Sequence, residues 1–167
     1  GTSCDGVDAS IIQSDGEDQL KIIENLYITY NDKTREDIRN VKDKIHSSSD
    51  IIKNKEQLLK LEKEITILQV RAVEEIINKS KLKKEQIDLI GFHGQTIYHS
   101  YREKISKQLG DGNLMNKLTK IKVVNNFREK DIQLGGQGAP LSPIYHKLLC
   151  KKLNLDYPIL FINIGGI

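Results

Sequence analysis

The sequence predicts an α/β fold, in which a β-sheet is flanked by helices. Runs of strand type alternate with runs of helical periodicity after an opening hairpin, and this order of elements is typical of that class. Four glycine-containing turns each follow a predicted strand or open a predicted helix. Because ligands bind where such turns collect at the strand ends of an open α/β sheet, the turns also indicate where a site is expected.

The first two strands are predicted to form the hairpin. Residues 7–13 place Val7, Ala9 and Ile11 on one face, and residues 20–30 form a second strand rich in Ile and Tyr. The polar stretch between them, residues 14–18, predicts the turn. A helix is expected over residues 34–47, followed by a loop over residues 47–50.

The longest predicted element is a helix over residues 55–80. Lys and Glu side chains form its solvated face, and we interpret the helix as scaffold. Its apolar stripe recurs at steps of three and four residues, through Leu58, Leu61, Ile65, Leu68, Ala72 and Ile76.

The second half of the chain continues the alternation. Helices are expected over residues 113–119 and 141–152, and residues 128–140 are predicted to form a loop that holds Asp131 and a Gly-Gly-Gln-Gly run. The remaining strands are expected over residues 87–92, 104–109, 121–127 and 158–164.

Composition excludes several classes of protein. The 26 basic and 23 acidic residues are well mixed, which excludes a polybasic nucleic-acid binder. No apolar run approaches the length of a membrane span, so no membrane partner is expected. Two cysteines, Cys4 and Cys150, are too few for a disulfide framework or a zinc knuckle. With no secretory signal, a cytoplasmic location is expected.

The glycine turns carry the residues best suited to chemistry. The first turn offers the hydroxyls of Thr2 and Ser3, backbone donors, and the carboxylates of Asp5 and Asp8. That set can hold a phosphate and, through a carboxylate, a Mg²⁺ ion, although taken alone it is also what an ordinary turn contains. It lacks the pattern of a Walker A loop.

Asp131 is the best single candidate for a catalytic carboxylate. It lies between Arg128 and the glycine run, where it could act as a general base toward water or a hydroxyl. The alternative is a helix cap or a partner for Arg128. His93 follows an apolar strand and precedes Gly94, so it could donate to a sugar or a carboxylate, or cap the strand end.

These turns, in this order, resemble one family closely. The matching stretches are GTSCDGVD at residues 1–8, HGQTIYH at 93–99, LGDG at 109–112, NFREKDIQLGGQGAPLSPIYH at 126–146 and NIGGI at 163–167. They resemble anhydro-N-acetylmuramic acid kinases, which belong to the actin/hexokinase/Hsp70-like sugar-kinase superfamily. The resemblance implies an actin-like ATPase (ribonuclease H-like) lobe, with a mixed sheet and flanking helices.

The resemblance implies an enzyme of peptidoglycan recycling. It would use ATP and Mg²⁺ to open the 1,6-anhydro bridge of the sugar and phosphorylate O6, with Asp131 as the base that activates water. The first turn would bind ATP, with Asp5 as the metal ligand, through Gly1, Thr2, Ser3, Cys4, Asp5, Gly6, Val7 and Asp8. The sugar would be bound by His93, Gly94, Gln95, Thr96, Arg128, Gly135, Gly136 and Gln137.

The resemblance also bears on domain organisation and partners. We expect residues 1–167 to be a single N-terminal lobe of a two-lobe kinase, cut at both ends and inactive without the C-terminal lobe. The implied partners are the amino sugar, ATP and that missing lobe, and an actin-like lobe also admits a homodimer. Two other functions are weighed against this one. The first is a catalytically dead actin-like remnant or interaction module, and the second is a sugar hydrolase that uses Asp131 without ATP, against which the phosphate-loop match argues.

Overall fold

The computed structural model describes residues 4–162, and its first feature is an antiparallel hairpin. Strands β1 (Gly6–Ser14) and β2 (Leu20–Thr29) pair along their whole length, with a bulge between Ile11 and Ile12. The Asp15 carboxylate closes the turn by accepting the backbone N–H groups of the three residues Glu17, Asp18 and Gln19. The predicted hairpin is therefore confirmed.

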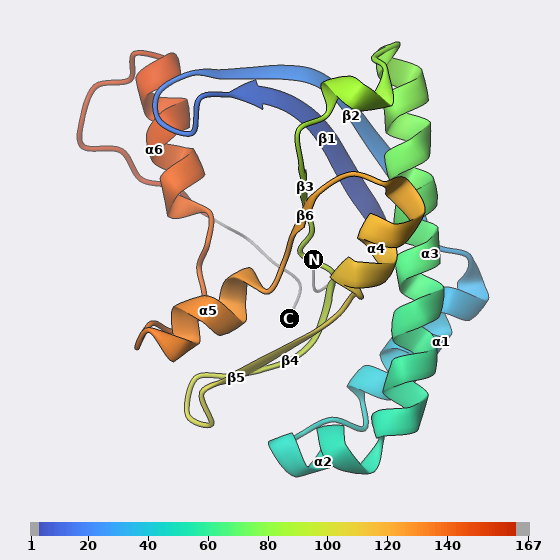
Figure 1. Cartoon of the computed structure of the whole chain (residues 1–167). Coiled ribbons are helices and arrows are strands. Elements are labelled where there is room, and N and C mark those ends of the chain that lie inside the picture. The colour runs from blue at the N-terminus through green and yellow to red at the C-terminus, as the bar shows by residue number, and fades with distance from the viewer. Residues whose placement is uncertain (1–3, 163–167) are drawn as a thin grey trace.

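Helix α3 (Lys55–Ser80) is the longest element and has the bounds that the sequence predicts. It packs against both strands of the hairpin, and Figure 1 shows it running along one side of the molecule. The predicted apolar stripe is its buried face, apart from the half-buried Leu68. No helix within residues 4–162 is both long and apolar enough to cross a bilayer.

Two short helices lead into α3. Helix α1 (Asp32–Lys42) begins and ends earlier than the predicted helix over residues 34–47. At its start the Asn31 side chain caps it, accepting the N–H of Thr34 at 2.8 Å. The expected loop over residues 47–50 is wrong, because Ser47 is the N-cap of helix α2 (Ser48–Lys53) and accepts the N–H of Asp50. Both corrections come from polar side chains that start a helix rather than end one.

The main core lies where α1 and α3 meet the strands. Ile38, Ile65 and Leu109 are completely buried there. A smaller cluster forms farther along α3, from Val70, Phe92 and Met115. Burying such side chains contributes about 1.5–3 kcal/mol each, so these clusters fix the position of the strands against α3.

The strands after α3 are shorter than predicted. A single turn of 3₁₀ helix, η1 (Lys84–Gln86), leads to β3 (Ile90–Gly91), which pairs in parallel with β6 (Val123–Val124). The predicted strands over residues 87–92 and 121–127 each keep only two ladder residues. Strand β5 (Ile105–Leu109) is close to its prediction, and its antiparallel partner β4 (Gln95–Ser100) was not predicted as a strand.

Three helices complete the described chain. Helix α4 (Gly112–Thr119) follows the LGDG turn, and α6 (Pro143–Lys152) follows the glycine run. The expected loop over residues 128–140 is wrong in its first half, because helix α5 (Phe127–Gln133) occupies it. Of the expected strand over residues 158–164, residues 158–162 are not in a strand and residues 163–164 lie outside the described part. The α/β class is confirmed, with small parallel and antiparallel sheets flanked by helices.

Leu61 and Leu59 on α3 offer a matched test of this packing. Leu61 is 5% exposed and Leu59 is 54% exposed. We expect Leu61→Ala to lower the free energy of unfolding by about 2–5 kcal/mol, since it leaves a cavity in the core. Leu59→Ala should change it by less than about 0.5 kcal/mol. Urea denaturation followed by circular dichroism measures both, and equal losses would contradict the assigned helix face.

Candidate functional site

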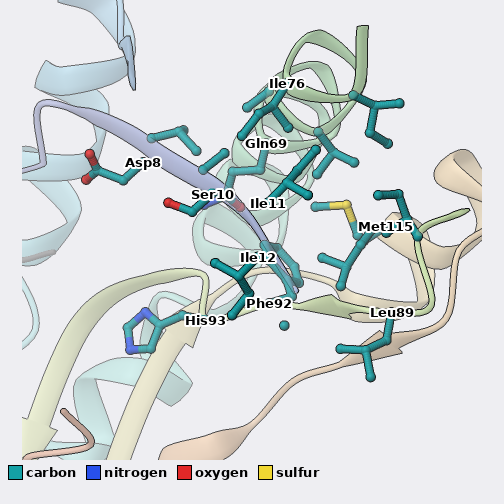
Figure 2. A pocket seen from close by; sticks show the side chains of 18 of the residues that line it. Asp8, Ser10, Ile11, Ile12, Gln69, Ile76, Leu89, Phe92, His93 and Met115 are labelled. Atoms are coloured by element: carbon teal, nitrogen blue, oxygen red, sulfur yellow. The ribbon is translucent and has the colours of Figure 1, made fainter. Parts of the chain in front are cut away.

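A cleft of about 1030 Å³ brings two of the predicted turns together. It lies between β1, one face of α3 and the segment over residues 86–95. Figure 2 shows Asp8 and His93 toward one end of it and Leu89 and Met115 toward the other. Gly6, Val7 and Asp8 of the GTSCDGVD stretch, which the structure places at the start of β1, line the same space as His93, Gly94 and Gln95 of the HGQT motif.

The first turn is tied to both neighbouring elements. Its residues 1–3 lie outside the described part of the chain. Cys4 is buried with a positive φ of 59°, and its sulfur accepts a hydrogen bond from the Gln95 side chain at 3.5 Å. The Asp5 carbonyl accepts the N–H of Tyr30 at 2.9 Å. Cys4 and Asp5, which belong to the described part of the predicted phosphate turn, are therefore held against HGQT and the end of β2.

Tyr27 on β2 is a neighbour of Asp5 and Asp8, and it was not singled out in the sequence analysis. Partial desolvation raises the pKa of its phenol, and the negative charges of Asp5 and Asp8 raise it further. Asp8 and Tyr27 are also register partners in the hairpin. The carboxylates of Asp5 and Asp8 therefore both lie near the Tyr27 phenol, and a cation held there would interact with both.

The HGQT motif is a tight backbone approach rather than an open loop. Gly94 has a φ of 71°, and a Cβ at this position would collide with the carbonyl oxygen of Leu109. Gln95 and Thr96 then begin β4, and the Thr96 hydroxyl accepts a hydrogen bond from Gln108 at 3.2 Å. Because Gln95 is 2% exposed and donates to Cys4, its side chain faces the first turn.

Two residues of α3 hold the LGDG turn and were missed by sequence reasoning. The Glu62 carboxylate accepts the N–H of Gly110 at 3.1 Å and pairs with Lys107 at 3.0 Å. The Thr66 hydroxyl accepts the N–H of Asp111 at 3.0 Å. Nothing in the local sequence distinguishes these two residues from the other polar positions of a charge-rich helix.

Asp131 and Arg128 lie on α5, and both bind Gly138. The Asp131 Oδ2 accepts the N–H of Gly138 at 2.7 Å, and Arg128 Nη1 donates to the Gly138 carbonyl at 2.7 Å. Arg128 Nε also donates to His93 Nε2 at 2.8 Å. The structure therefore links the HGQT turn, α5 and the glycine run through Arg128. Within residues 4–162 no ion pair joins Arg128 to Asp131.

The glycine run folds around the Asp131 carboxylate. A Cβ on Gly136 would collide with that carboxylate, so the backbone at this point approaches it as closely as it can. Gly138 is buried, whereas Gly135 and Gln137 are exposed. Asp131 Oδ1 accepts no hydrogen bond from residues 4–162, which leaves it open to a ligand.

The surroundings of His93 favour the neutral form of its imidazole. Burial lowers the pKa of its imidazole, and the nearby Arg128 charge lowers it further, against an opposing hydrogen bond to Gly94. As for metal ligands, no group of three or more His, Cys, Asp or Glu side chains that could hold an ion occurs in the described part. The charged and polar groups of the site include carboxylates, the Arg128 guanidinium, the His93 imidazole and backbone groups.

Comparison with known proteins decides the family. A sequence model described as anhydro-N-acetylmuramic acid kinase matches residues 1–167. The chain belongs to the anhydro-N-acetylmuramic acid kinase family. The resemblance noted from the motifs is therefore confirmed, and with it the actin-like fold class.

Curated relatives agree with this assignment over the whole chain. A Pelagibacter ubique protein named anhydro-N-acetylmuramic acid kinase is 48% identical over 167 residues, which are 44% of its length. Proteins of the same name from Brucella suis and Rhodopseudomonas palustris (strain CGA009) are 38% and 36% identical, covered to 45% and 46%. The chain spans about half the length of the curated relatives it matches.

Gly94 and Gly16 give a matched test of the close approach in this kinase-family chain. Both have a positive φ, but a Cβ at Gly16 would meet nothing within 4 Å. Gly16→Ala should cost only the left-handed backbone penalty, about 1–2 kcal/mol of unfolding free energy. Gly94→Ala should cost clearly more, because the Leu109 carbonyl must also move. Thermal denaturation of the two variants checks this, and equal shifts would contradict the contact.

Proposed function

We propose that this chain is part of an enzyme that phosphorylates 1,6-anhydro-N-acetylmuramic acid while opening its anhydro ring by hydrolysis. The observation that carries the proposal is the Asp131 carboxylate, held by the Gly138 N–H on one oxygen and open on the other. A general base needs that combination of fixed orientation and a free lone pair. The product would be N-acetylmuramic acid 6-phosphate.

The chemistry follows from where the charges lie. Asp131 would accept a proton from water as the water oxygen attacks the anomeric carbon, and the bond between that carbon and O6 would break. The freed O6 would then take the γ-phosphoryl group, leaving ADP. Water is a weak nucleophile, so a positioned carboxylate matters in the first step, while the second depends mainly on alignment and charge neutralisation.

The ATP phosphates would be bound by the first turn, residues 1–8. Gly6, Val7 and Asp8 border the cleft, which supports this placement for the described part of the turn. Asp5 and Asp8 provide the carboxylate oxygens that Mg²⁺ takes, usually one or two alongside substrate phosphates. When bound, the ion would neutralise charge that develops on the phosphates. Asp5 is the ligand we propose for it.

The sugar would lie between HGQT and the glycine run. His93 and Arg128 are joined there at 2.8 Å, and the exposed Gly135 and Gln137 belong to the glycine run, whose Gly136 approaches the Asp131 carboxylate. Backbone groups of Gly94 and Gly136 and the side chain of Thr96 complete the proposed set. Gln95 and Arg128 are the members with least support as direct ligands, since the Gln95 amide faces Cys4 and the Arg128 guanidinium donates to His93 and Gly138.

We further propose that the chain is one N-terminal lobe of a two-lobe kinase of amino-sugar metabolism and peptidoglycan recycling in the cytoplasm. Large apolar side chains on α6 and in the residues after it are exposed to solvent, and a second lobe would cover them. Strand β1 pairs only with β2 within residues 4–162, which leaves an edge for a further strand. The most exposed of these side chains are Ile144, Tyr157, Leu160 and Ile162.

Asp131→Asn tests the proposed base in the full-length protein. Asn keeps the shape but cannot take the proton, so we expect kcat to fall roughly 100- to 10,000-fold. A coupled assay with Mg-ATP and 1,6-anhydro-N-acetylmuramic acid measures the rate. Glu129→Gln, an exposed carboxylate on the same helix, is the control and should stay within about 2-fold of wild type. An Asp131→Asn enzyme with normal turnover would refute the assignment.

The lobe proposal predicts that residues 1–167 alone are inert. The same assay should detect turnover by the full-length protein and none by this chain, because the adenosine-binding part would be missing. Turnover by residues 1–167 alone would contradict the proposal. A full-length protein that is folded but inactive would instead favour the non-catalytic remnant.

A further inference from the structure

We propose that Arg128 is a positioning residue, which holds His93 and the backbone of Gly138 together and thereby fixes the carboxylate of Asp131. This inference rests on the proposed function, since it assigns a role within that site. The family resemblance places Arg128 among the sugar ligands. Its hydrogen bonds in the structure are directed at the protein instead.

The two ring nitrogens of His93 have partners that leave only one arrangement of protons. Arg128 Nε can only donate, so His93 Nε2, 2.8 Å away, must accept. The Gly94 carbonyl can only accept, so His93 Nδ1, at 2.8 Å, must carry the proton. His93 is therefore neutral and protonated on Nδ1, and a side chain used in this way is neither a general acid nor a general base.

Arg128 and Asp131 use opposite ends of one glycine residue. Arg128 donates to the carbonyl of Gly138 while Asp131 accepts from its N–H, both at 2.7 Å. The two side chains are three positions apart on α5, so they project from the same side of the helix. Gly138 is thus bound on both its carbonyl and its N–H from one face of α5. A shift of the carbonyl therefore also shifts the N–H that orients the Asp131 carboxylate.

Gly138 has little freedom to adjust. It is buried with a φ of 72°, and a Cβ there would lie 2.8 Å from the Ile132 side chain. No other residue type fits this conformation and this space without strain. The geometry of the carboxylate therefore depends on the bonds at Gly138 rather than on adaptable side chains.

A guanidinium suits this role and an ammonium does not. The planar fork of Arg128 presents Nε to His93 and Nη1 to Gly138 at fixed relative angles. A lysine could donate to one of these acceptors but could not reach both in the same geometry. Arg128→Lys is therefore a second informative variant alongside Arg128→Met.

The first test reads the His93 protons directly and needs no activity. In full-length protein labelled with ¹⁵N-histidine, with His93→Gln assigning the signals, NMR should show a protonated Nδ1 and an unprotonated Nε2. Arg128→Met should abolish that single tautomer, whereas Lys130→Met, an exposed cation on the same helix, should leave it unchanged. A wild-type Nε2–H tautomer, or an unchanged tautomer in Arg128→Met, would overturn the proposal.

The second test separates positioning from sugar binding. Misplacing a base by about an ångström costs roughly 100-fold in rate, so Arg128→Met should lower kcat by that order with KM nearly unchanged. Combined with Asp131→Asn it should cause no further loss, because Arg128 acts through Asp131. A raised KM at normal kcat, or losses that multiply, would overturn the proposal and make Arg128 a sugar ligand.

The two tests also distinguish this inference from the proposed function. If the full-length wild-type protein has no kinase activity, the proposed function fails, while the NMR experiment still decides the Arg128–His93 arrangement. If Arg128→Met does not melt cooperatively, Arg128→Lys replaces it in both experiments. Because a lysine can donate to only one of the two acceptors, we expect this variant to lose either the single tautomer or the wild-type kcat. Retention of tautomer and kcat in Arg128→Lys would overturn the proposal.

Discussion

The position of helix α3 is the constraint on which the other elements depend. Its apolar face packs against the hairpin and α1 (Figure 1). Ile65 on this face is completely buried in the main core. The same helix reaches the site through Glu62 and Thr66, which accept backbone N–H groups of the turn before α4. One rigid helix therefore fixes both the core and the turn that supports HGQT, and the burial that stabilises the core also sets the geometry of the site.

From that turn the site is built by backbone groups in direct contact. Gly94 packs on the carbonyl of Leu109, and Gly110 in turn lies against the ring of Phe92. Across the site, the backbone of Gly136 approaches the Asp131 carboxylate in the same manner, and Gly138 donates its N–H to that carboxylate. Close approaches of this kind transmit position better than flexible side chains do, because neither partner can rotate away. The glycine turns of the sequence thus serve alignment as well as backbone freedom.

The sequence predicted the elements whose signals are local. Helix α3 and the hairpin agree because an uninterrupted period of 3.6 or 2 residues needs no partner to be recognised. The strands around residues 90 and 123 were overestimated, since their length depends on pairing between segments far apart in the chain. Strand β4 was not predicted because it contains several polar residues and therefore shows no clear alternation. It forms through its pairing with β5, which the local sequence does not reveal. In the site, the turns and Asp131 could be named, but the inward direction of the Arg128 bonds could not.

The loop predicted over residues 128–140 contains helix α5 in its first half, and this difference has a physical reason. The glycine run favoured a loop throughout, yet residues 127–133 contain good helix formers and the helix ends before Gly135. In a helix, an arginine and an aspartate three positions apart would ordinarily pair with each other. Here the Gly138 carbonyl accepts from Arg128 and the Gly138 N–H donates to Asp131, so backbone groups lie between two side chains that could otherwise form an ion pair. The helix therefore explains how a guanidinium can orient this carboxylate without binding it.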